Sequence, residues 1–105
     1  MANQNEGHRQ RLRTKFLKSG LDGFHDYEII ELLLTLGTPR KDCKSVAREA
    51  LKKFGTLKSV LEADPSKLKE IKGIGDNNVF GLKITQAVSR RIALWIKILC
   101  VHRKK

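Results

Sequence analysis

The sequence has little cysteine, few aromatic residues, few acidic residues and no long apolar run. Its two cysteines, Cys43 and Cys100, lack metal-ligand spacing and are too few for a disulfide framework, so we expect free thiols in a reducing compartment. No run approaches the roughly 18 apolar residues of a membrane span, and no secretory leader opens the chain. The three histidines are scattered, which excludes the usual zinc motifs. We therefore expect a cytoplasmic protein with no metal, no cofactor and no membrane partner.

The charge is strongly unbalanced toward basic residues. The 105 residues carry 22 Lys and Arg against 11 Asp and Glu, a formal net charge of +11, and no acidic residue follows Asp76. Such a balance favours an anionic partner, most often nucleic acid, although a charge that serves solubility alone stays equally open. The length is that of one domain, which excludes a two-lobed enzyme with a deep cleft.

The apolar periodicity is helical throughout, and strand signals are weak. It predicts helices over about 6–18, 27–36, 42–54, 57–62, 65–71 and 77–99, with Asp26, Asp42 and Asp64 as N-caps and Gly20 and Gly55 as stops. The expected fold is therefore all-α, a compact bundle of five to six short helices. The few aromatic residues stand among apolar neighbours, and we expect them in the core rather than as platforms for stacked bases.

The end of the chain departs from this pattern. Residues 92–101 are apolar at every position except Lys97, where a surface helix shows a single apolar stripe. Either this turn is buried all round, or it docks against a second copy or against a missing part of a longer protein. We therefore divide the chain into a domain over residues 1–91 and an apolar, then basic, tail over residues 92–105.

The sharpest local motif is a glycine hairpin. Two glycines flank Ile74 between the helices expected over 65–71 and 77–99, which is the pattern of a helix-hairpin-helix motif. Glycine permits the tight turn, and amides left unpaired at the following helix start can bind a phosphate without reading sequence. Asp76 and Val79 depart from the usual pattern, and a merely structural turn is the alternative. The predicted DNA contacts are Lys72, Gly73, Ile74, Gly75, Asn77, Asn78 and Lys83.

A second, degenerate hairpin precedes this one. It joins the helices expected over 27–36 and 42–54 but has only one glycine, Gly37, so its phosphate contacts would come from the side chains of Arg40, Lys41 and Lys44. Two such hairpins together can span both strands of a duplex, whereas a plain turn with solvated lysines is about as well supported. The basic residues of the first helix, Arg9 to Lys18, could extend the phosphate track, although a solvated face is the default.

Several longer strings resemble the N-terminal domain of the RadC family of bacterial proteins. They are Gly7-His8-Arg9 with Arg11-Leu12-Arg13, Gly20-Leu21-Asp22-Gly23-Phe24, Pro39-Arg40-Lys41-Asp42 and Ile71-Lys72-Gly73-Ile74-Gly75. The resemblance covers roughly residues 7–91 and implies a helix-hairpin-helix domain and a link to DNA repair. It also implies that full-length members carry a C-terminal metal-binding domain of the JAB/MPN type. None of the metal motifs of that second domain occurs in this sequence.

These observations lead to one principal hypothesis and one alternative. The principal hypothesis is a non-catalytic, sequence-independent DNA-binding module that contacts the backbone of duplex or branched DNA through the glycine hairpin. The alternative is a protein-interaction or oligomerisation module that uses the apolar C-terminal helix, with a purely structural hairpin. An enzyme is third, because no nucleophile–base pair or carboxylate pair is evident and neither His8 nor His25 has an evident catalytic neighbour.

Overall fold

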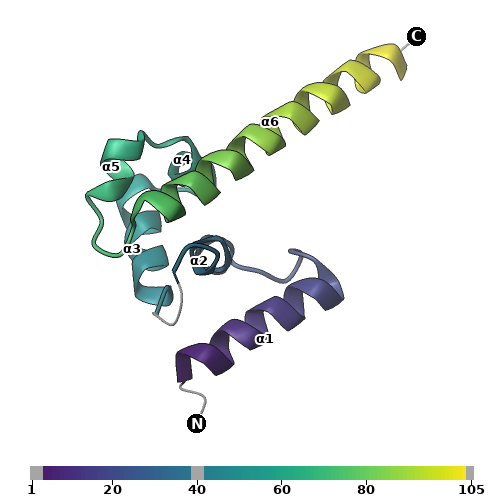
Figure 1. The fold of residues 1–105 in the computed structure, drawn as a ribbon. Coiled ribbons are helices and arrows are strands. Elements are labelled where there is room, and N and C mark those ends of the chain that lie inside the picture. The colour runs from purple at the N-terminus through teal and green to yellow at the C-terminus, as the bar shows by residue number, and fades with distance from the viewer. Residues whose placement is uncertain (1–3, 39–41, 104–105) are drawn as a thin grey trace.

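The computed structural model describes residues 4–38 and 42–103, and over these ranges the chain forms helices and connecting turns with no strand (Figure 1). The all-α expectation is therefore confirmed. The helices are α1 (Gln4–Ser19), α2 (Asp26–Thr35), α3 (Lys44–Phe54), α4 (Leu57–Glu62), α5 (Pro65–Lys69) and α6 (Asp76–Arg103).

Turn-forming residues end or begin three of these helices as the sequence predicted. Gly20 and Gly55 follow α1 and α3 with φ of +69° and +96°, a region that residues with a Cβ avoid. Asp64 caps α5 by accepting a hydrogen bond of 3.2 Å from the Ser66 amide, and Pro65 occupies the first helical position. The local signals therefore place these ends correctly.

Two predicted N-caps lie one residue away from the cap position. Asp26 is the first residue of α2, and His25 is its N-cap. Asp42 precedes the N-cap of α3, Cys43, although the Asp42 carboxylate still accepts a hydrogen bond of 2.9 Å from the Lys44 amide. The Asp42 side chain still satisfies an amide at the helix start, so at α3 the error is one of register only.

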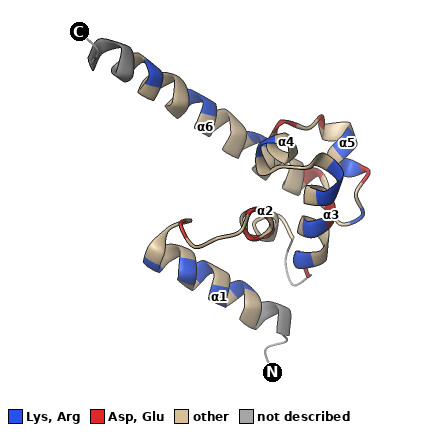
Figure 2. Ribbon diagram, turned by 180° about the vertical axis from the view of Figure 1, so that it is seen from behind, with Lys and Arg blue, Asp and Glu red and all other residues tan. Residues whose placement is uncertain are grey.

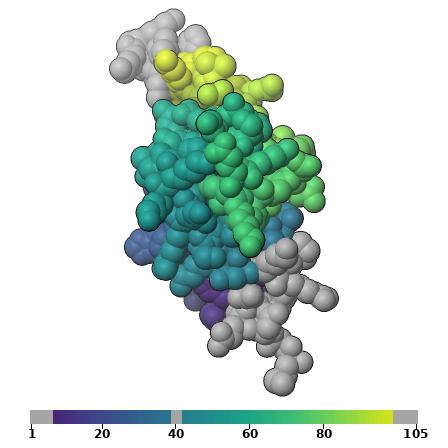
Figure 3. Space-filling view, turned by 90° about the vertical axis from the view of Figure 1, so that its left-hand side faces the viewer, coloured from purple at the N-terminus to yellow at the C-terminus, as the bar shows by residue number. Residues whose placement is uncertain are grey.

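The core lies around α2, which packs against α1, α3, α4 and α6. Ile30 and Leu34 of α2 are fully buried, and the other members of the main cluster come from α3 to α6, from Cys43 before α3, and from Ile71 and Ile74 between α5 and α6. In the space-filling view the side chains of α3 to α5 and the start of α6 form one closely packed surface (Figure 3). This packing fixes the positions of the two turns that the sequence singled out.

Helix α6 extends far beyond this core (Figure 1). It has 28 residues and passes through residue 92 without a break, so the proposed division at residue 91 falls within a helix. The radius of gyration is 15.4 Å, above the ~13 Å of a compact 100-residue domain, because the distal part of α6 projects from the body. None of the described helices is long and apolar enough to cross a membrane.

The apolar residues of distal α6, which we define as residues 84–98, are exposed. Ile92 and Trp95 are 53% and 65% exposed, so the alternative in which this turn is buried all round within the chain is wrong for residues 92–98. The expectation that the aromatic residues lie in the core is likewise wrong for Trp95, Phe80 and Phe16, which are exposed. Neighbouring residues in the sequence show helical spacing, but they do not show whether another element covers that stretch of helix.

Candidate nucleic-acid interface

The glycine hairpin comprises residues 72–75, between α5 and α6. Its conformation requires a glycine at Gly73. The φ of Gly73 is +101°, and a Cβ at this position would lie 2.7 Å from Cγ2 of Val46 in α3. Both the backbone conformation and the close approach of α3 therefore favour glycine. Ile74 is buried in the main cluster, as predicted, and anchors the hairpin.

Gly75 has no such structural reason. Its φ lies outside the left-handed region, and a Cβ built there would meet no heavy atom within 4 Å. The open space lies directly before the first turn of α6, and Gly75 itself is exposed. A glycine that the fold does not require, at an exposed helix start, leaves room for another molecule to approach the backbone.

The hairpin amides are more fully bonded than the sequence suggested. The Ile74 amide donates to the Ile71 carbonyl at 3.1 Å, and the Gly75 amide donates to Oδ1 of Asn78 at 2.9 Å. The expectation of unpaired loop amides is therefore wrong for these two residues. The first amides of α6, at Asp76 and Asn77, have no partner within the helix, because a helix leaves its first N–H groups unsatisfied. They remain the donors that this hairpin can offer to an anion.

Asn78 connects the hairpin to the end of α2 rather than facing solvent. Its side chain is buried, and Nδ2 donates to the Leu34 carbonyl at 3.0 Å and to Oγ1 of Thr38 at 2.7 Å. A Cβ on Gly37 would lie 2.9 Å from the Asn77 carbonyl carbon, so the two turns pack backbone to backbone. The sequence placed Asn78 among the DNA contacts, but the structure gives it a role in holding the two turns together.

The predicted basic contacts do not share one site. Lys72 is exposed at the hairpin, and Lys44 is half-buried at the start of α3. Lys83 is half-buried, and its ammonium donates to the carbonyls of Leu61, at 3.0 Å, and Ala63, which satisfies the end of α4. Arg40 and Lys41 lie outside the described residues. Of the basic residues predicted as contacts, Lys72 is the one described at the glycine hairpin and exposed.

Asp76 carries a negative charge beside the hairpin, but a lysine pairs with it. Its carboxylate forms an ion pair with the ammonium of Lys69 in α5 and accepts a hydrogen bond from it. This hydrogen bond lowers the pKa of Asp76 below its ordinary value. Both residues are exposed, so the pair contributes little to stability. It does reduce the repulsion that an approaching phosphate would meet at the first turn of α6.

Basic residues elsewhere are distributed over several surfaces. Figure 2 shows Lys and Arg positions on α1, α3, α5 and along α6, whereas several Asp and Glu positions lie at or near the connections between helices. This distribution provides a broad positive field rather than one deep basic cleft.

Comparison with known proteins identifies the family. A model described as UPF0758 N-terminal matches residues 4–80, most of the chain. The chain belongs to the UPF0758 family. It is 51% identical over 80 residues to a UPF0758 protein of Fusobacterium nucleatum, 43% over 82 residues to one of Rhodobacter capsulatus, and 42% over 86 residues to one of Ruegeria pomeroyi. These alignments cover 76%, 78% and 82% of this chain.

The UPF0758 N-terminal family is the N-terminal region of the RadC family, so the resemblance seen in the sequence strings is confirmed at the family level. The chain spans 34–38% of the length of these relatives. The matched region includes the glycine hairpin and the first turn of α6 and stops before distal α6. No solved structure matches the chain.

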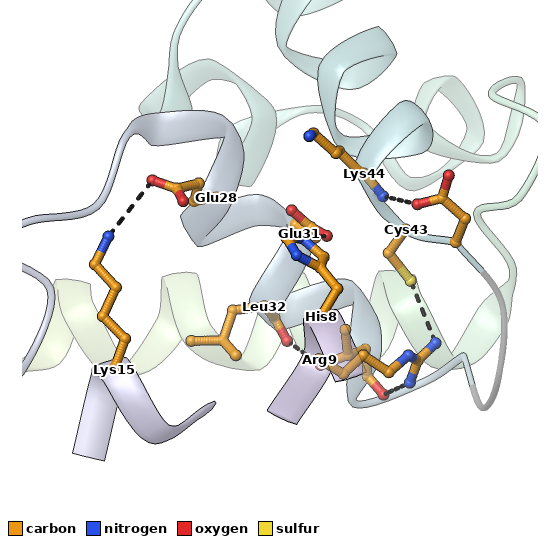
Figure 4. A network of polar contacts seen from close by, with 10 residues as sticks. His8, Arg9, Lys15, Glu28, Glu31, Leu32, Cys43 and Lys44 are labelled. Atoms are coloured by element: carbon orange, nitrogen blue, oxygen red, sulfur yellow. Dashed lines mark hydrogen bonds and ion pairs between the residues drawn. The ribbon is translucent and has the colours of Figure 1, made fainter. Parts of the chain in front are cut away.

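The region that matches the UPF0758 family also contains a buried polar cluster that the sequence analysis did not predict (Figure 4). Arg9 of α1 is only 8% exposed. Its guanidinium donates to the Thr35 carbonyl at 3.4 Å and to the Thr38 carbonyl. It also donates to Sγ of Cys43 at 3.7 Å. It therefore lies away from any phosphate track along α1. The available signal was its position three residues before the buried Leu12, on a neighbouring part of the helix surface.

His8 does have a carboxylate neighbour. Its Nε2 lies 2.7 Å from Oε2 of Glu31, which is 2% exposed in α2. Burial raises the pKa of Glu31, and His8 offsets part of that effect. Together with Arg9, this pair attaches α1 to α2. Among the described residues no three His, Cys, Asp or Glu side chains gather as a metal site, and the thiol of Cys43 is buried with a raised pKa.

The buried carboxyl of this UPF0758 domain gives a pH-dependent stability. Because the pKa of Glu31 is raised on folding, its contribution favours the folded state at low pH and is lost as pH rises above about 4.5 through the folded pKa. We therefore expect the free energy of unfolding of Glu31→Gln to increase relative to that of wild type as the pH is raised from about 4 to about 7. Urea unfolding of both proteins across this range measures the difference, and a constant difference at all pH values would contradict the assignment.

Proposed function

We propose that this chain is a non-catalytic module that binds the backbone of duplex or branched DNA without sequence preference, as part of a RadC-like bacterial DNA repair protein. The observation that carries the proposal is the exposed start of α6 at Gly75, where the fold leaves open space beside unsatisfied helix amides. The net charge of +11 and membership in the UPF0758 family support it. We also propose that a metal-binding domain of the JAB/MPN type occupies the remaining length of the longer relatives.

The proposed contact surface is smaller than the predicted set of residues. It consists of Lys72, the backbone at Gly73 and Gly75, and the amides of Asp76 and Asn77. We leave out Asn78 and Lys83, whose polar atoms bond within the protein, and buried Ile74, which acts as the anchor. A phosphate oxygen at this position gains from the dipole of a 28-residue helix and from the ammonium of Lys72.

Duplex affinity across salt concentrations tests the proposal. Two or three phosphate contacts predict a log–log slope of about −2 to −3, and Gly75→Val should weaken binding about tenfold because its side chain fills the approach space. Lys67→Ala on α5 is the matched control and should change affinity by less than about twofold. An affinity that ignores salt, or equal losses in the two variants, would contradict a hairpin contact.

The alternative is an interaction module in which the hairpin is purely structural. The exposed apolar side chains of distal α6 favour it, since isolated soluble proteins rarely expose contiguous apolar surface of this kind. It predicts oligomers that form with rising concentration and no DNA binding at physiological salt. Sedimentation with and without a short duplex separates the two functions by whether the duplex sediments with the chain, because association of the chain alone is compatible with both.

A further inference from the structure

An open apolar groove lies between α1 and α2 and reaches α6. Its volume is about 490 Å³, and its walls are apolar side chains together with Arg13 of α1 and Thr85 of α6. Phe16, Leu17 and Leu36 line it and remain exposed. The described part of this chain leaves the groove unfilled.

A second apolar surface runs along α6 from the same place. Ile84, Val88, Ile92 and Trp95 are spaced by four, four and three residues, which puts them on one face of the helix, and all four are exposed. A shallow hollow along this stripe includes Thr85, which also lines the groove. The groove and the stripe therefore form one continuous apolar surface.

The stripe cannot fill the groove of its own chain. α6 is one continuous helix whose distal part points away from α1 and α2 (Figure 1). The groove of a second copy is available to the stripe. A two-fold axis near Thr85 would let each copy place its stripe in the groove of the other, which makes the contact self-complementary.

We propose that this surface is the interface of a homodimer in which distal α6 of each copy occupies the groove between α1 and α2 of the other. The three groove residues named above, Leu21 and the four stripe residues are each 40–82% exposed. If the contact covers roughly half of this exposed area, or about 50 Å² on each side chain, a dimer buries on the order of 800 Å² of apolar surface. This matches the apolar share of a complex near the ~1,200 Å² lower limit for stable interfaces, so we expect a dissociation constant of about 10–100 µM.

Charge determines how this dimer responds to salt. Each copy carries a net charge of +11, so two copies repel each other and added salt should strengthen the dimer. DNA binding through phosphate contacts has the opposite salt dependence. The two proposals can therefore fail independently, and the dimer does not depend on the DNA-binding proposal.

Sedimentation equilibrium of the full chain, from about 1 to about 300 µM in about 0.1 and about 1 M NaCl, tests the dimer. Ile92→Asp and Leu17→Asp should each weaken association at least tenfold, because a carboxylate would enter an apolar contact. Ala93→Asp adds the same charge one residue from the stripe and should have a much smaller effect. An equimolar mixture of Ile92→Asp and Leu17→Asp should recover part of the association, because one of the two helix–groove contacts is then intact.

Three results would overturn the proposal. The wild-type chain could remain monomeric over the whole range in both salts. Leu17→Asp could associate as strongly as wild type, which would place α6 against α6 and leave the groove unused. A monomer that binds phosphatidylglycerol vesicles through the same stripe would assign the surface to an anionic membrane instead.

Discussion

Gly73→Ala should destabilise the folded chain by about 2–5 kcal/mol. An alanine at φ of +101° costs about 1–3 kcal/mol in backbone strain. Its Cβ would also lie 2.7 Å from Cγ2 of Val46, so α3 or the hairpin must move. Small domains are stable by only about 5–15 kcal/mol, so this single methyl group removes a large fraction of the total. Urea unfolding followed by circular dichroism measures the loss.

Two further variants separate the causes of this effect. In the Val46→Ala background the clash is removed and Gly73→Ala should cost less, which leaves the backbone strain alone. Gly75→Ala adds a methyl group to open space and should cost at most about 1 kcal/mol, because alanine is a poorer N-cap than glycine. Equal losses for Gly73→Ala and Gly75→Ala would contradict the described geometry of the hairpin.

Asn78→Ala should destabilise the chain by roughly 3 kcal/mol. It removes the two bonds donated by Nδ2 to Leu34 and Thr38 and the bond that Oδ1 accepts from the Gly75 amide. Each lost bond costs about 0.5–1.5 kcal/mol, and the backbone groups left unsatisfied near the core add to this cost. Thermal or urea unfolding gives the value.

Asn77→Ala is the matched control for Asn78→Ala. Asn77 is the adjacent residue on α6 and is exposed, so its loss should change stability by no more than about 0.5 kcal/mol. If both variants lose the same stability, Asn78 does not join the two turns. Asn77→Ala should also leave duplex affinity nearly unchanged, because the proposed contact uses the Asn77 backbone amide, which the variant keeps.

The sequence was sufficient to predict the helices and the turn between α5 and α6 because those depend on local chemistry. Asp64 followed by Pro65 favours a helix start through an N-cap side chain and a preset φ, and glycine at Gly20 and Gly55 favours a helix end. Ile74 could be placed in the core because it is a large apolar residue in the turn between two amphipathic helices. The fold class followed from the same local signals.

The roles of Asn78 and Arg9 could not be predicted because they depend on residues far away in the sequence. Asn78 bonds to Leu34, 44 residues earlier, and Arg9 bonds to Cys43, 34 residues later. A polar side chain at a helix start is equally compatible with solvent, a cap or a bound phosphate until its tertiary neighbours are known. Likewise, the apolar pattern of α6 does not show that no other helix of the chain reaches its distal part.

A backbone amide shift titration of the labelled chain with a short DNA duplex is the sharpest test of the hairpin contact. We expect Lys72, Gly73 and the amides of Gly75 to Asn77 to shift first and furthest, and the buried Asn78 side-chain amide to keep its bonds to Leu34 and Thr38. Shifts confined to α1 or distal α6, with an unmoved hairpin, would contradict it.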